Sequence, residues 1–128
     1  MLTLPLEQLG YIVAKAREYD AEVAPADGAA GGLEDEHGIL ESTTDNPTRR
    51  ELIAAIRSLN DDERVELIAL MWLGRGDMEA SEWTELLRLA RERHNKRDAE
   101  YLAGTPLLSD YLLEGAAALG CSMEDLEG

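Results

Sequence analysis

The sequence predicts an all-α protein, a compact orthogonal bundle of about five helices with a flexible Gly-rich loop after the first helix. Three observations lead to this fold class. Apolar residues make up 45% of the chain, yet Phe is absent, and the apolar content comes chiefly from Leu and Ala, which favour helices. These residues recur at three- and four-residue steps. Proline and glycine interrupt the pattern at intervals, and 128 residues suit a single domain, 1–128.

The first predicted helix covers residues 6–23. Its apolar face is made by side chains spaced along one side of a helix: Leu6, Leu9, Ile12, Val13, Ala16 and Tyr19. Between residues 24 and 45 the pattern stops, because Pro25 and four glycines break it and an acidic run buries nothing. We therefore expect a mobile loop at 24–45, followed by a helical core at 46–120.

Two asparagines mark the next helix starts. Asn46 precedes Pro47, an order typical of an N-cap followed by proline at the first helical position, so a helix is predicted from Pro47 to about Asn60. Asn60 and Glu63 then have the spacing of a capping box, and the helix that follows is apolar on nearly all sides from its middle onward. It is predicted to be the buried centre of the bundle and to end at Gly74 in the left-handed conformation.

The last two predicted helices follow a tight turn. Asp77 is predicted to cap the fourth helix, which runs to Leu102 with or without a break. Thr105 and Pro106 then repeat the order of cap and proline, so the fifth helix is predicted to begin there. The acidic tail at 121–128 is expected to fray.

Charge and cysteine content exclude several functions. The chain has 27 acids against 12 Lys and Arg, a net charge of −15, which opposes binding to nucleic acid and to anionic lipid surfaces. No apolar run reaches the roughly 18 residues of a membrane span, and the first residues lack a secretory signal. Cys121 is the single cysteine, so no intramolecular disulfide is expected and a cytoplasmic location is predicted.

No motif reaches the specificity of a catalytic, metal-binding or cofactor-binding signature. Glu34 and His37 have the spacing of a carboxylate bridge in di-metal bundles, but there is one copy and it lies in the Gly-rich segment. The calcium-loop pattern fails from Asp77 onward, because Arg88 stands where a Glu ligand is needed. We therefore predict no catalytic residue, no metal and no cofactor, and a role other than that of an enzyme is favoured.

Basic residues concentrate in the second half of the fourth predicted helix. Five of the twelve fall within ten residues: Arg88, Arg91, Arg93, Lys96 and Arg97. One interpretation is structural, because cations near the C-terminal end of a helix complement its dipole and pair with surface acids. The other is a face that binds an acidic protein partner. This second interpretation predicts a small non-enzymatic interaction or regulatory module. Such a module could also form homo-oligomers through an apolar helix face.

The alternative hypothesis is a small-molecule-binding or enzymatic domain with a pocket near the turn between the third and fourth helices. Its candidate lining residues are Trp72, Arg75, Trp83, His94 and Tyr101. Aromatic, His and Arg side chains that converge are typical of ligand pockets. The structural interpretation of His94 is a hydrogen-bonded core histidine, because its position extends the apolar stripe of the helix.

Two sequence blocks each join a helix end, a tight turn and a helix start. The first is Met71-Trp72-Leu73-Gly74-Arg75-Gly76-Asp77 with Trp83 after it, and the second is Tyr101-Leu102-Ala103-Gly104-Thr105-Pro106-Leu107-Leu108 with Asp110-Tyr111-Leu112 and Glu114-Gly115. On these blocks, residues 46–120 resemble a bacterial family of small acidic proteins, the domain of unknown function 3775. The resemblance implies a bacterial cytoplasmic origin, but it implies no activity, substrate or cofactor.

Overall fold

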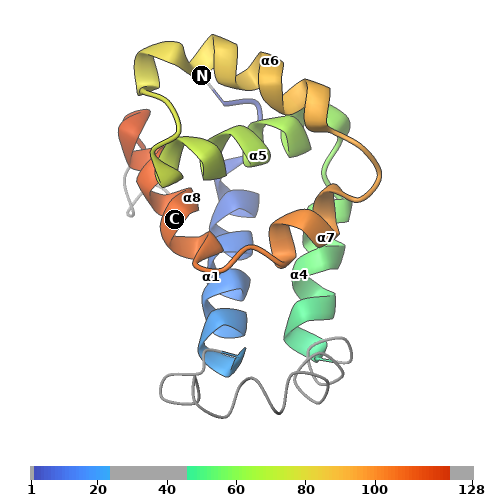
Figure 1. The fold of residues 1–128 in the computed structure, drawn as a ribbon. Helices are drawn as coiled ribbons and strands as arrows, with labels where there is room; N and C mark the ends of the chain where they lie inside the picture. The colour runs from blue at the N-terminus through green and yellow to red at the C-terminus, as the bar shows by residue number, and fades with distance from the viewer. Residues whose placement is uncertain (1, 24–45, 122–128) are drawn as a thin grey trace, which may run out of the picture.

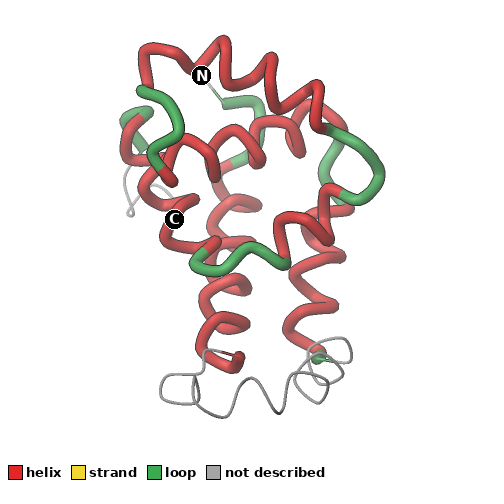
Figure 2. Tube along the Cα trace, in the orientation of Figure 1, coloured by secondary structure: helices red, strands yellow, loops and turns green. Residues whose placement is uncertain are grey.

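The computed structural model describes residues 2–23 and 46–121. This part of the chain forms six α-helices and one 3-10 helix, and it contains no strand (Figure 2). The all-α prediction is confirmed, with one helix more than the five expected. The predicted mobile loop at 24–45 and the tail beyond Cys121 lie outside the described residues.

Figure 1 shows how the helices are arranged. Their bounds are α1 (Leu6–Val23), α4 (Pro47–Arg57), α5 (Asp61–Arg75), η1 (Ala80–Glu82), α6 (Trp83–Arg93), α7 (Asp98–Ala103) and α8 (Leu108–Ala118). The helices α1 and α4 lie side by side, and α5 runs across their direction (Figure 1). It packs against both α6 and α8, while the short α7 packs against α4 and α5. Because Val65 and every residue from 67 to 71 are fully buried, α5 is the centre of the bundle.

The predicted starts of α4 and α5 are confirmed. Asn46 accepts a hydrogen bond from the Arg49 backbone N–H at 3.0 Å, and Pro47 is the first residue of α4. Asn60 and Glu63 form the predicted capping box, with backbone-to-side-chain distances of 2.8 and 2.9 Å. These caps satisfy backbone donors that a helix start otherwise leaves unpaired.

The predicted end of α5 is wrong by two residues. Gly74 is helical, α5 continues to Arg75, and the left-handed residue is Gly76, with φ of 95°. Asp77 does not cap the following helix, because its carboxylate binds Arg75 instead and Glu79 precedes η1. Gly74 has a different role, described below, that depends on a neighbouring helix.

The long fourth helix begins as the 3-10 turn η1, which leads directly into α6, and is then broken once. It is divided into η1, α6 and α7, with residues 94–97 forming a turn between the last two. His94 therefore ends α6 and does not extend its apolar stripe. The predicted start at Thr105 and Pro106 is also wrong. The helix α8 begins at Leu108, after Leu107 in a left-handed conformation with φ of 62°.

The helices α5 and α8 cross at unusually short range. A Cβ atom added to Gly74 would lie 1.7 Å from the carbonyl oxygen of Tyr111, and one added to Gly115 would lie 2.3 Å from that of Leu70. Neither position can therefore carry a side chain while the two backbones stay where they are. This crossing holds the C-terminal half of α5 against α8.

A buried carboxylate connects the N-terminal segment to α5. Glu66 is 7% exposed and accepts hydrogen bonds from the Thr3 and Leu4 backbone N–H groups and from the Thr3 hydroxyl, at 2.9 to 3.0 Å. These donors compensate the carboxylate for the loss of water. The contact places Leu4, 1% exposed, in the core just before α1 begins. None of the described helices is long and apolar enough to cross a membrane.

Replacing Gly74 with Ala is expected to destabilise the fold by about 3 kcal/mol, because the new methyl group would collide with backbone atoms that have little room to move. Gly104→Ala is the control, since its methyl group would lie 3.2 Å from the nearest atom, the Glu100 carbonyl oxygen. Urea unfolding followed by tryptophan fluorescence measures both variants. Equal midpoints for the two would contradict the proposed role of the crossing.

Glu66→Gln is expected to lower the free energy of unfolding by about 1–3 kcal/mol, since an amide NH₂ replaces one of the two acceptor oxygens facing the donors of Thr3 and Leu4. Glu92→Gln on the exposed side of α6 is the matched control and should change it by less than about 0.5 kcal/mol. The same unfolding measurement applies. A Glu66→Gln protein as stable as the control would show that the contact between Glu66 and the N-terminal segment does not contribute to the free energy of unfolding.

Candidate functional site

The first two residues of the predicted partner face, Arg88 and Arg91, are paired with acids. Arg88 binds Glu85 and Glu92 on its own helix, and Arg91 Nη2 lies 3.0 Å from the Asp62 carboxylate on α5. The hydrogen bond from Arg88 lowers the pKa of Glu85, and the same bond raises the pKa of Arg88. These two cations therefore follow the structural interpretation of the basic cluster.

Arg93 has a different environment, because it stacks on an aromatic ring. Its guanidinium carbon lies 3.8 Å from the centre of the Tyr101 ring on α7. The Tyr101 hydroxyl accepts a hydrogen bond from Trp72 Nε1 at 3.0 Å, so α5 fixes the ring in place. A cation over the face of an aromatic ring is attracted to it and loses freedom of movement. Arg93 is thus held in one orientation without an ion pair to any acid in the described part of the chain.

Arg75 completes this group from the end of α5. Its Nε and Nη2 atoms donate to the two carboxylate oxygens of Asp77, at 3.3 and 2.7 Å. The hydrogen bond to Asp77 is the main reason that the pKa of Arg75 is raised, and Tyr101 contributes to the same shift. We call Trp72, Arg75, Arg93 and Tyr101 the guanidinium–aromatic cluster.

Two further cations follow in the turn between α6 and α7. Lys96 and Arg97 are exposed, and neither forms an ion pair with any residue that the structure describes. The backbone carbonyl of Arg97 accepts a hydrogen bond from the Tyr101 N–H at 2.9 Å, so Arg97 lies one helical turn before Tyr101. We call the guanidinium–aromatic cluster together with Lys96 and Arg97 the basic surface.

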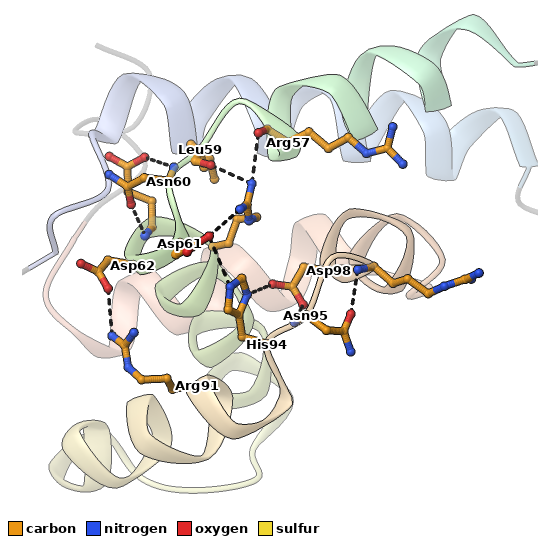
Figure 3. A network of polar contacts seen from close by, with 12 residues as sticks. Arg57, Leu59, Asn60, Asp61, Asp62, Arg91, His94, Asn95 and Asp98 are labelled. Carbon is orange, nitrogen blue, oxygen red and sulfur yellow. Dashed lines mark hydrogen bonds and ion pairs between the residues drawn. The ribbon is translucent and has the colours of Figure 1, made fainter.

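His94 lies between two carboxylates (Figure 3). Its Nδ1 atom is in hydrogen-bond contact with Asp98, and its Nε2 atom is 3.3 Å from Asp61 Oδ1. Asp98 is 2% exposed and also accepts a hydrogen bond from the Asn95 N–H at 3.0 Å. Both ring nitrogens therefore face carboxylates of the protein.

Figure 3 shows that the same network reaches the end of α4. Arg64 donates to the carbonyl oxygens of Arg57 and Leu59 at 3.1 and 2.8 Å, and to Asp61 at 2.7 Å. Asp61 therefore links Arg64 to His94. The network joins the end of α4, the start of α5 and the turn after α6, and its role is to fix these three segments relative to one another.

The five predicted pocket residues do not stay together. Trp72, Arg75 and Tyr101 meet in the guanidinium–aromatic cluster. Trp83 is 9% exposed and belongs to the hydrophobic core, and His94 joins the carboxylate network instead. The sequence analysis did not identify the partners of His94. The four-residue step from His94 to Asp98 is a usable signal once the helix is known to end at His94.

A second basic feature lies on α4 and was not predicted. An open pocket of about 640 Å³ is lined by Arg49, Arg50, Ile53, Ala54, Arg57, Ser58 and Glu100. The only acid of α4, Glu51, forms an ion pair with Lys15 of α1 and does not line the pocket. The sequence signal is the arginine content of α4, which holds Arg49, Arg50 and Arg57 within 11 residues.

Metal binding finds no support in the described residues. Within 2–23 and 46–121, no group of three or more His, Cys, Asp or Glu residues could hold a metal ion. Glu34 and His37, which have the carboxylate-bridge spacing, lie outside this part of the chain.

The fold and the surface together define a small acidic all-α domain built around one central helix. Its sequence matches the model of the family described as a protein of unknown function, DUF3775, over residues 49–121. The chain belongs to this family. A search of curated proteins and a search of solved structures each gave no match.

His94→Ala is expected to destabilise the protein by about 1–3 kcal/mol, because it leaves the buried carboxylate of Asp98 without the ring nitrogen. Arg91→Ala is the control from the same region and should cost less than about 1 kcal/mol, since its pair with Asp62 is exposed. Urea unfolding midpoints compare the two. If His94→Ala costs no more than the control, the network does not hold the helix ends.

Proposed function

We propose that this protein is a non-enzymatic interaction module whose basic surface binds an acidic segment of a protein partner. The observation that carries the proposal is the stacking of Arg93 on Tyr101, 3.8 Å from the ring centre. In a chain with 27 acids, this guanidinium is held by a ring and by no carboxylate of residues 2–23 and 46–121. The cytoplasmic location of this interaction is part of the proposal and rests on the single cysteine.

The stacked geometry suits carboxylate recognition. A guanidinium presents its N–H groups along its edge, so Arg93 can bind a carboxylate through two parallel hydrogen bonds while its face stays on Tyr101. Because the ring already restricts Arg93, less side-chain freedom is lost when a ligand binds. Lys96 and Arg97 in the adjacent turn add positive charge without ion pairs to described residues.

The net charge of −15 favours a short acidic segment over a nucleic acid. At physiological salt, charges further away than about 8 Å are largely screened, so a bound peptide responds mainly to the local cations. A long polyanion extends past the basic surface toward the acidic remainder of the protein and is repelled there. The same screening makes peptide binding sensitive to salt.

The second candidate function is binding of a small anionic molecule at the guanidinium–aromatic cluster. The meeting of Trp72, Arg75 and Tyr101 favours it, because aromatic faces beside a cation are common in ligand sites. Acid–base catalysis at this site has no support from His94, whose ring nitrogens both face carboxylates. Binding without catalysis is therefore the form of this alternative that the geometry favours.

A titration with fluorescein-labelled octaglutamate tests the proposal by fluorescence anisotropy. The wild-type protein should bind at low ionic strength, and the Arg93→Glu, Arg97→Glu double variant should raise Kd by more than about tenfold, since it reverses two charges at the surface. Arg17→Glu is the control, because Arg17 is an exposed cation on α1, away from the basic surface.

Three results separate the hypotheses. Loss of binding in the double variant, with Arg17→Glu near the wild-type Kd, supports the basic surface. No binding by the wild-type protein, or equal losses in the two variants, contradicts it. Light scattering at the concentrations used shows whether a second copy of the chain competes for the surface. If the wild-type protein is a dimer and the double variant is a monomer, the partner is a second copy of this protein.

A further inference from the structure

The pocket on α4 has its cations arranged along one face of the helix. Arg50, Ile53, Ala54 and Arg57 line it at three- and four-residue steps. Arg50 and Arg57 are therefore two turns apart, about 10 Å along the helix axis, which is the length of about three extended residues. Arg49 and Arg50 also lie in the first turn of α4, where the helix dipole adds positive potential.

A carboxylate of the protein itself occupies the end of this pocket. Glu100 of α7 accepts a hydrogen bond through Oε2 from Arg57 Nη2, and this is a single contact where a carboxylate and a guanidinium can form two. Its other oxygen, Oε1, is buried and has no hydrogen-bond partner among the described residues. A buried carboxylate oxygen without a donor is costly, so releasing Glu100 from this position would recover part of that cost.

Consecutive residues of α7 belong to the pocket and to the basic surface. Glu100 precedes Tyr101 in the chain, and Arg97 lies three residues before Glu100, immediately before the first residue of α7. Arg57 of α4 contacts the Glu100 carboxylate. A segment bound at Arg93 and Arg97 can extend over Glu100 toward Arg57.

We propose that the α4 pocket binds the continuation of the partner's acidic segment, and that Glu100 is a built-in competitor that holds Arg57 until a ligand carboxylate replaces it. This inference rests on the proposed function and deepens it. The occupant is a carboxylate-rich peptide, because the pocket combines cations with the apolar side chains of Ile53 and Ala54. A ligand carboxylate that forms two hydrogen bonds to Arg57 replaces one that forms a single bond.

Two substitutions with opposite effects follow. Glu100→Gln removes the competing charge and should lower Kd for octaglutamate by about threefold or more, whereas Arg57→Ala removes the ligand's partner and should raise it by a similar factor. In the Arg57→Ala background, Glu100→Gln should have little effect, because the two residues act on the same ligand group. A gain in affinity from Glu100→Gln cannot come from partial unfolding.

The matched control is a second exposed Arg–Glu pair, Arg88 and Glu85 on α6. Glu85→Gln makes the same change in net charge as Glu100→Gln, and Arg88→Ala the same as Arg57→Ala. If the α6 variants change Kd as much as the α4 and α7 variants, the effect is general electrostatics and the inference is wrong. It is also wrong if Glu100→Gln lowers Kd equally in the presence and absence of Arg57.

Running the Arg93→Glu, Arg97→Glu double variant in the same series separates this inference from the proposed function. If the double variant loses binding while substitutions at Arg57 and Glu100 leave Kd unchanged, the basic surface binds the peptide and the α4 pocket does not. If the wild-type protein does not bind octaglutamate, both proposals fall. Backbone amide shifts of residues 49–58 on titration, seen by NMR, would place the peptide in the pocket directly, and their absence would contradict it.

Discussion

Two helices approach as closely as α5 and α8 only where neither carries a side chain. Gly74 and Gly115 provide that surface, and each lies against a backbone carbonyl of the other helix. The contact fixes the direction of α5, which in turn packs against α6 and α7. Trp72 and Arg75 come from the same stretch of α5. The contact between α5 and α8 therefore also sets the position of the guanidinium–aromatic cluster.

Local features of the fold were accessible from the sequence, whereas features that depend on a neighbour were not. The caps at Asn46 and Asn60 use atoms within a few residues of each other, so their spacing was sufficient. Gly74 suggested a helix end, because the residues that it contacts on α8, Tyr111 and Gly115, are 37 and 41 residues away in the chain and no local pattern reveals them. The break at His94 depends on Asp61 as well as on Asp98, and no local pattern contains that information.

The candidate site shows the same division. The concentration of basic residues near the end of α6 was visible, but which of them are paired was not, since Asp62 and Tyr101 reach Arg91 and Arg93 from other helices. The contacts therefore divide these cations into two groups: those that stabilise the fold through ion pairs and those that form the basic surface. In an acid-rich protein, the positions that escape pairing carry more information than the number of bases does.

Glu66 bears on where this domain begins. The family match covers residues 49–121, yet a carboxylate inside that region is satisfied by Thr3 and Leu4, and α1 covers both α4 and α8. A fragment cut at the start of the match would expose these apolar faces and leave the carboxylate without its donors. The unit that folds is thus larger than the region that the family model matches.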